Sequence, residues 1–225
     1  IDASEIASTR SRIEAAVQEF LSRLPEGAGE YEIVKSAYEY VILNTSYDNS
    51  LSCSQNQNIQ SVFLLHESIC AGYAKAFQYL LHRAGVYCAY IEGTIEGNSD
   101  DGTADSSGSI SDGRNAHAWN LVRIDGTYTL VDPTWGDPTY SADTPDINAP
   151  SIFYGYLCIT TEEMARLNHV PDAAYALPDC SSRQYDYYRM NGMYYETYDE
   201  NTISSVLWDA IDNNVSEVHF KFGDF

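Results

Sequence analysis

The stretch HESICAGYAKAFQYLLHRAG, residues 66–85, places a cysteine at the start of a predicted helix. Apolar side chains recur after Cys70 at helical spacing, and Gly85 supplies a residue typical of a helix end. A thiol at a helix N-terminus lies at the positive end of the helix dipole, which favours the thiolate. Small residues directly follow Cys70, so the approach to its sulfur stays open. Residue types alone leave two interpretations of Cys70, a buried structural thiol and a nucleophile.

Helices and strands are predicted on both sides of this segment. Apolar periodicity predicts helices over 3–24 and 30–43, and the run 86–93, rich in β-formers, predicts a strand. Residues 94–116 form an acidic loop rich in Gly and Ser, for which we expect a solvated segment and no EF-hand. The segment HAWNLVRIDGTYTLVDPTW, residues 117–135, has the pattern of a β-hairpin.

The register of this hairpin brings two chemically useful side chains together. A two-residue turn at Asp125 and Gly126 pairs Ile124 with Thr127. His117 and Asp132 then lie diagonally on one face with Cβ atoms about 7 Å apart, which allows an imidazole–carboxylate hydrogen bond. A slip of one residue would put them on opposite faces. The sequence therefore predicts a histidine oriented by a carboxylate, two of the three groups of a nucleophilic triad.

The composition changes near residues 178–182, which we take as a domain boundary. Beyond it, a Tyr-rich segment predicts two strands around Asn191 and Gly192, followed by a helix over 202–211 and a strand over 217–222. We therefore expect a larger domain over 1–180 and a small β-β-α-β unit over 181–225.

Charge and cysteine content limit the partners that we expect. The 225-residue chain carries 12 Lys and Arg against 33 Asp and Glu, a net charge of −21, which disfavours nucleic acid and anionic membranes as partners. The sequence contains neither an apolar run of about 20 residues nor a signal-peptide pattern, and a chain that begins at Ile1 suggests a mature or trimmed form. Five cysteines without a CxxC pair make a structural zinc site improbable, so we expect no metal.

Two separated segments, and the order of the Cys, His and Asp that they carry, together resemble the transglutaminase-like superfamily of cysteine enzymes, which has a papain-like core. SICAGYAKAFQYLLHRAGV carries Cys70, and NAHAWNLVRIDGTYTLVDPTWGD carries His117 and Asp132, in the family's order. The resemblance is strongest over 57–137 and assigns these residues as nucleophile, general base and orienting acid. It implies an α+β fold in which N-terminal helices pack on an antiparallel sheet, with the small β-rich unit appended and no cofactor.

The expected activity is thiol-dependent acyl transfer on amide or peptide bonds through a thioester. We favour hydrolysis, since water is always present, over cross-linking through a protein glutamine. The alternative from a different functional class is a surface-binding module without catalytic activity. The resemblance extends to secreted or surface proteins of Gram-positive bacteria, which implies a protein or peptide substrate, such as a cell-wall peptide, and no membrane span.

Further residues have candidate roles. In similar proteins a glutamine before the nucleophile helps to hold the oxyanion, which points to Gln57, with Gln55 and Gln60 as competitors. Trp119 and Trp135 are candidates for the walls of an acyl-binding cleft, although aromatic residues near a hairpin are more often core. The remaining histidines are expected to be surface residues or internally satisfied: His66, His82, His169 and His219.

Overall fold

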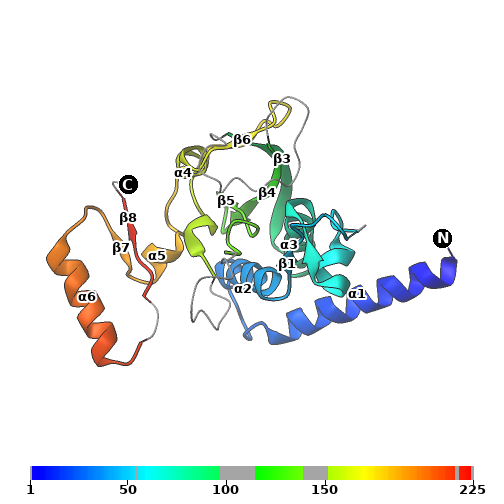
Figure 1. Ribbon diagram of the computed structural model, residues 1–225, viewed down its shortest axis with the longest axis horizontal. Helices are drawn as coiled ribbons and strands as arrows, with labels where there is room; N and C mark the ends of the chain where they lie inside the picture. Colours follow the sequence, from blue (N-terminus) through cyan, green and yellow to red (C-terminus); the bar gives the residue numbers. More distant parts are fainter. Residues whose placement is uncertain (1, 54, 97–114, 139–151, 216–217, 224–225) are drawn as a thin grey trace. The chain divides into compact units, whose positions relative to one another are not determined.

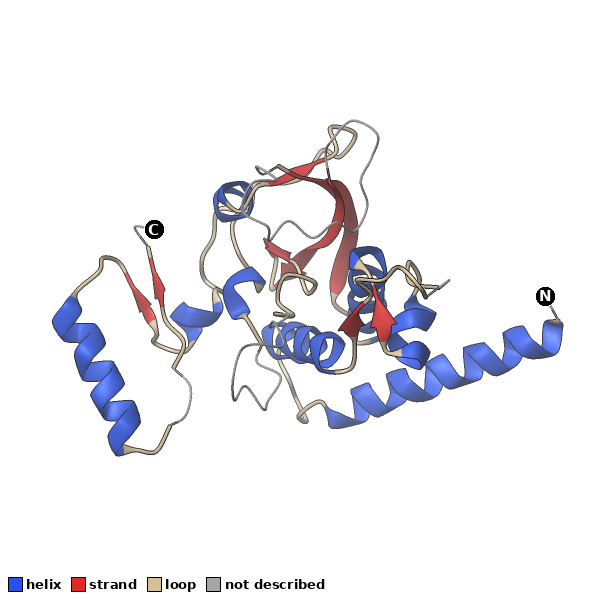
Figure 2. Ribbon diagram, in the orientation of Figure 1, coloured by secondary structure: helices blue, strands red, loops and turns tan. Residues whose placement is uncertain are grey.

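The computed structural model describes residues 2–53, 55–96, 115–138, 152–215 and 218–223 (Figure 1). They divide into two compact units, Ile1–Ser182 and Arg183–Phe225. The larger unit contains both helices and strands (Figure 2). No helix in the described parts of the chain combines the length and the apolar character that a membrane span needs.

The larger unit opens with two helices, α1 (Ala3–Arg23) and α2 (Glu30–Leu43). The carboxylate of Asp2 accepts a hydrogen bond from the N–H of Ser4, which caps α1. One face of α2 is buried, and its apolar side chains form part of the core: Val34, Ala37, Tyr38, Val41 and Ile42. Both helices lie where apolar periodicity predicts them.

A third helix, α3 (Cys70–Arg83), packs against the sheet and carries Cys70 in its first turn. Its inner face is fully buried, as the spacing of Ala74, Phe77, Leu80 and Leu81 predicts. The amide of Asn120 on the sheet donates a 3.0 Å hydrogen bond to the carbonyl of Ala74. This buried bond fixes the helix to the sheet one turn after Cys70.

The sheet has four antiparallel strands in the order β5-β4-β3-β6. Their bounds are β3 Tyr87–Ile95, β4 Asn115–Ile124, β5 Thr127–Val131 and β6 His169–Pro171. Ile124 pairs with Thr127, so the predicted hairpin register is confirmed. Asp125 and Gly126 both have positive φ, 47° and 85°, which is the type I′ turn favoured in two-residue hairpins. The α+β fold with helices on an antiparallel sheet is thus confirmed.

Short elements hold the polar segment before α3 against that helix. Strands β1 (Ser46–Tyr47) and β2 (Glu67–Ser68) pair in parallel, and a π-helical turn spans Ser61–Leu65. A Cβ atom on Gly72 would lie 1.9 Å from the Ser68 hydroxyl and 2.8 Å from the carbonyl of Asn56. Only glycine therefore lets the residues next to Gln57 approach the first turn of α3.

After the hairpin the chain crosses a 3-10 turn (Tyr154–Tyr156) and helix α4 (Thr161–Arg166) before it enters β6. The Thr160 hydroxyl caps α4 by accepting a hydrogen bond from the N–H of Glu163. An isolated bridge pairs Leu130 with Ile159. Most of the predicted acidic loop, 97–114, lies outside the described residues.

The smaller unit contains α5 (Tyr187–Met190), β7 (Tyr194–Tyr195), α6 (Glu200–Asp212) and β8 (Lys221–Phe222). β7 and β8 pair in parallel. The prediction of a strand before Asn191 is wrong, because the carboxylate of Asp186 accepts hydrogen bonds from two backbone N–H groups and starts a helical turn. The Tyr-rich hairpin is therefore a short helix followed by a two-residue strand.

Candidate active site

Cys70 lies at the N-terminus of α3, after Ile69, whose extended backbone forms the N-cap. Its residue surface is 6% exposed, and it lines an open cleft of about 740 Å³. The first N–H groups of a helix have no partner within the helix and point toward its N-terminal end. The thiol is thus reachable from the cleft and lies in a positive local field.

His117 on β4 and Asp132, directly after β5, form the predicted hydrogen bond. Nε2 of His117 lies 2.6 Å from Oδ2 of Asp132, and both side chains are buried. Because Nε2 faces the carboxylate, Nδ1 is the ring nitrogen that remains for another partner, and Cys70 is among the neighbours that raise the pKa of His117. His117 lines the same cleft as Cys70.

The Asp132 carboxylate is held on both of its oxygens. Oδ1 accepts hydrogen bonds from the backbone N–H groups of Thr134 and Trp135, at 2.9 and 3.3 Å. The backbone N–H of Asp132 donates to the carbonyl of Tyr156 at 3.0 Å. These bonds orient Oδ2 toward the interior, where His117 approaches it.

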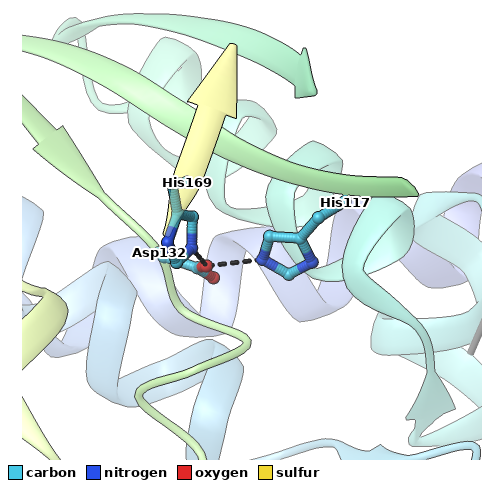
Figure 3. A group of neighbouring side chains, drawn as sticks. All are labelled: His117, Asp132 and His169. Carbon is cyan, nitrogen blue, oxygen red and sulfur yellow. Dashed lines mark hydrogen bonds and ion pairs between the residues drawn. The ribbon is translucent and has the colours of Figure 1, made fainter. Parts of the chain in front are cut away.

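His169, at the start of β6, also bonds this oxygen (Figure 3). Its Nε2 lies 2.9 Å from Oδ2 of Asp132, while its Nδ1 lies 2.9 Å from the carbonyl of Leu167. Its side chain is fully buried. The sequence predicts His169 only as a surface or internally satisfied histidine and does not predict this contact with Asp132. No local pattern identifies it, since β6 has three residues and reaches the site by pairing with the distant β3.

Aromatic rings surround the two histidines. The ring of His169 lies 5.2 Å from that of Trp119, 5.6 Å from Trp135 and 5.8 Å from Tyr156, measured between centroids. Trp119 also stacks on His117 at 6.0 Å. This packing excludes water from Asp132, which strengthens its electrostatic interactions.

Trp119 and Trp135 differ from the expected cleft walls. Trp119 is 1% exposed and belongs to the core. Trp135 is 39% exposed, and its ring lies 6.2 Å from that of His117. Among the described residues, those that line the cleft do not include either tryptophan. Trp119 is therefore a core residue, because its position on β4 turns it inward.

Charges within this cluster shift the pKa values of Asp132 and His117. Burial opposes ionisation of Asp132, but the charge and the hydrogen bond of His117, together with those of His169, outweigh it and lower the pKa of Asp132. Burial likewise opposes a charge on His117, yet Asp132 and the hydrogen bond with Cys70 raise the pKa of His117. The arrangement favours a negative carboxylate beside a positive imidazolium.

Gln57 also lines the cleft, whereas Gln55 and Gln60 are not among its lining residues in the described parts of the chain. The carbonyl of the preceding residue, Asn56, accepts hydrogen bonds from the Ser68 hydroxyl and from the N–H of Ile69. The peptide before Gln57 is thus bonded to the residues that lead into Cys70.

Three potential ligand atoms, from His117, Asp132 and His169, lie within 4.8 Å of one another. Two ligands of a tetrahedral metal, each about 2.0–2.1 Å from it, would be about 3.3 Å apart. The 2.6 and 2.9 Å separations are shorter and match hydrogen bonds. We therefore describe the group as a hydrogen-bonded cluster.

The five cysteines form no disulfide with one another in the described parts of the chain. A hydrogen bond of 2.6 Å from the Tyr73 hydroxyl to Asp137 ties the first turn of α3 to the segment that follows Asp132. This contact fixes the element that carries Cys70 relative to the one that carries Asp132.

Comparisons with known proteins give the following relatives. Kyphoscoliosis peptidase from Mus musculus and its Homo sapiens counterpart are each 25% identical over 212 residues, which cover 89% of this chain. The chain spans 30% of the length of these relatives. Two solved structures are remote likenesses: a TGase (TM-score 0.43, 14% identity, 68% of this chain and 39% of that one) and the periplasmic domain of TgpA from Pseudomonas aeruginosa bound to ethylmercury (0.38, 16%, 56% and 44%).

The match to a family model identifies the superfamily of this chain. The profile described as "Transglutaminase-like superfamily" matches residues 19–133, just over half of the chain, and this range includes Cys70, His117 and Asp132. The chain belongs to the transglutaminase-like superfamily.

Proposed function

We propose that this protein is a thiol-dependent acyl-transfer enzyme that acts on amide or peptide bonds, with Cys70 as nucleophile. One observation carries the proposal: Cys70 and His117 line the same cleft, and His117 is bonded on its far side to the buried Asp132. A nucleophile beside a base that a third group orients is the general signature of covalent catalysis. Membership of a superfamily of cysteine enzymes supports the same conclusion.

In the first step the Cys70 thiolate attacks the carbonyl carbon of the substrate. A carbon–sulfur bond forms while the carbonyl electron pair moves to oxygen. The imidazolium of His117 then gives its Nδ1 proton to the amide nitrogen, the carbon–nitrogen bond breaks and the amine leaves. The product is a thioester on Cys70, with a neutral His117.

In the second step water or an amine resolves the thioester. The nucleophile gives a proton to Nδ1 of His117 as it attacks the carbonyl, and the carbon–sulfur bond breaks to return the thiolate and the imidazolium. The products are a carboxylic acid with water and a new amide with an amine. Atoms and charges balance over the cycle, and Asp132 keeps Nε2 of His117 oriented throughout.

The tetrahedral intermediate carries a negative oxygen that needs donors. The backbone N–H of Cys70, at the N-terminus of α3, is one candidate, because it belongs to the N–H groups that no helical carbonyl satisfies. The side-chain amide of Gln57, across the cleft, is the second candidate. Trp135, which is exposed next to His117, is our candidate for a contact with the acyl group.

We favour hydrolysis over transfer to a protein amine. The cleft is open, so water reaches the thioester without a dedicated channel. The relatives of this chain are described as peptidases, which supports a protein or peptide substrate. Cross-linking through a glutamine side chain is the alternative, and the partition of products between acid and amide separates the two.

Our proposal for the biological setting follows the expectation from the sequence, namely a secreted or surface protein of a Gram-positive bacterium with a cell-wall peptide as one candidate substrate. The rival from another class is a binding module that keeps the fold without the chemistry. Replacement of Cys70 by Ala separates them, because a binding module retains every effect after this change.

The test is the rate of alkylation by iodoacetamide against pH, followed by mass spectrometry. We expect Cys70 to react about 10- to 100-fold faster than Cys53 near pH 6.5, because only about 1% of an ordinary thiol is ionised there. Cys53 is a half-buried free thiol in the same chain and serves as the internal control. The advantage should fall in His117→Ala. Equal rates at the two thiols, unchanged in that variant, would overturn the proposal.

A further inference from the structure

Asp132 bonds two histidine rings, and the proposed chemistry uses only one of them. Oδ2 lies between Nε2 of His117 and Nε2 of His169, at 2.6 and 2.9 Å (Figure 3). We propose, on the basis of the function above, that His169 is a positioning residue: it holds Oδ2 of Asp132 in place and takes up part of the negative charge that His117 would otherwise receive alone.

The partners of His169 determine where its hydrogens lie. A carbonyl oxygen can only accept a hydrogen bond, so the 2.9 Å contact with Leu167 places a hydrogen on Nδ1. An ionised carboxylate also only accepts, so the contact with Asp132 places a hydrogen on Nε2. Each ring nitrogen of His169 therefore faces an obligate acceptor, and the ring holds Oδ2 of Asp132 in place.

The surroundings of His169 leave Asp132 as its charged partner. The side chain is fully buried, and the aromatic rings of Trp119, Trp135 and Tyr156 pack around it. A buried polar ring is stable only when its hydrogen bonds are satisfied. The carboxylate of Asp132 satisfies Nε2 of His169 as well as Nε2 of His117.

Other titratable groups face the cluster from several elements. Among the described residues, the ones nearest to His117 are Cys70 on α3, Asp132 after β5 and His169 on β6. Tyr156, on the 3-10 turn, faces Asp132 and has a raised pKa through burial and the carboxylate charge. Further out, the cleft is lined by Lys75, Tyr90, Glu92 and Asp172.

The effect of His169 on His117 has a definite sign. Its N–H group, and any positive charge on its ring, both reduce the negative potential of Asp132 at His117. The two rings lie 5.3 Å apart between centroids, close enough for a direct repulsion between like charges. His169 therefore keeps the proton affinity of His117 lower than Asp132 alone would set it, so that the proton can move to a leaving amine.

The experiment is ¹⁵N NMR of labelled histidine side chains during a pH titration. The chain has five histidines, so single variants assign the spectrum. His169→Phe keeps a ring but removes the donor, whereas His169→Gln keeps a donor that carries no charge. His82→Gln, an exposed site on the same chain, is the matched control.

The titration midpoint of His117 should rise by about one pH unit in His169→Phe, by less in His169→Gln, and stay unchanged in His82→Gln. A midpoint that stays or falls in both His169 variants would overturn the proposal.

These readouts also separate this proposal from the proposed function. The NMR titration does not depend on any substrate or on the reactivity of Cys70. An unreactive Cys70 in the alkylation test would therefore refute the proposed function alone, and an unchanged His117 midpoint would refute the role of His169 alone. If His169→Phe fails to fold, His169→Gln still decides the question.

Discussion

His117 and His169 bond the same carboxylate oxygen, but the chain brings them there by different routes. His117 comes from the β4–β5 hairpin, whose strands are joined by two residues, and β4 is paired with β3 from Asn115 to Arg123. His169 comes from β6, which is held to the edge of β3 by only three residue pairs. One ring is therefore fixed by local, redundant pairing and the other by a short contact distant in sequence.

The two histidines should therefore differ in how easily they are displaced from Asp132. Many backbone hydrogen bonds must break before His117 moves, whereas a small shift of β6 suffices to withdraw His169. Elements held by few contacts open more easily than the core. We expect changes near β6 to affect the site selectively, and changes at Asp132, where both routes meet, to have the largest effect.

Asp132→Asn should have the largest effect because it removes the acceptor of both rings. Breaking a buried charge pair from one side costs about 3–5 kcal/mol, so the free energy of unfolding should fall by that amount. Chemical denaturation at pH 6 measures it. Asp137→Asn is the control, because its carboxylate accepts a hydrogen bond from Tyr73 within the described residues, and the loss of that bond should cost about 1 kcal/mol. Equal losses would contradict the convergence of both routes on Asp132.

The pH dependence of the free energy of unfolding tests the interaction of His117 with Asp132. The raised pKa of His117, about 10, means that its contribution is complete below the unfolded value of about 6.5 and is lost as the pH rises toward the folded value. In Cys70→Ala the free energy of unfolding should fall by about 1.4 kcal/mol per pH unit above pH 6.5.

Denaturation of Cys70→Ala at pH 6.5, 7.5 and 8.5 measures this slope. A free energy of unfolding that stays constant over this range would contradict the raised pKa of His117.

Gly93→Ala should displace β6 and thereby His169. A Cβ atom at this position would lie 2.2 Å from the carbonyl of Val170 and 2.5 Å from the ring of Trp119, so β6 must move away. Such overpacking costs about 1–3 kcal/mol. NMR should show the loss of the His169 contact with Asp132 while the His117 contact remains. Thr94→Ala, which adds no atoms next to β6, is the control; loss of both contacts in Gly93→Ala would show that the two routes are not independent.

Gly126→Ala should have the smallest effect, although it lies in the hairpin turn. Its φ of 85° is strained for alanine, but no atom lies within 4 Å of the added Cβ, so the cost is about 1 kcal/mol. Gly85 has the same φ and the same open space, and Gly85→Ala is the matched control. Thermal unfolding should give similar losses for both, with the His117 resonances unchanged. A shifted His117 signal in Gly126→Ala alone would show that the turn, and not the pairing of β4 with β3, determines the position of His117.

The parts of the fold that the sequence predicts are those fixed by local signals. Apolar periodicity predicts α1, α2 and α3, and Asp125 with Gly126 predicts the register that joins His117 to Asp132. The roles of Cys70 and Gln57 in catalysis remain predictions for the experiments above.

The parts that escape prediction depend on contacts distant in sequence or on competing local signals. His169 is placed by β6, a three-residue strand whose partner lies far back in the chain. In the smaller unit, alternating tyrosines before Asn191 suggest a strand, but the cap from Asp186 starts a helical turn. Gly192, with a φ of 69°, then ends that helix and does not turn a hairpin.

The hydrogen bond between Tyr73 and Asp137 determines which residues must accompany the site when it is grafted onto another protein. It joins two residues that take no part in the chemistry, one three positions after Cys70 and the other five after Asp132, so it acts as a spacer between nucleophile and acid. Tyr73 is fully buried, and burial raises the pKa of Asp137 against the effect of the Tyr73 hydrogen bond. A designer who transplants Cys70, His117 and Asp132 must therefore carry Tyr73 and Asp137 with them, because the spacing of the reactive groups is encoded in that pair.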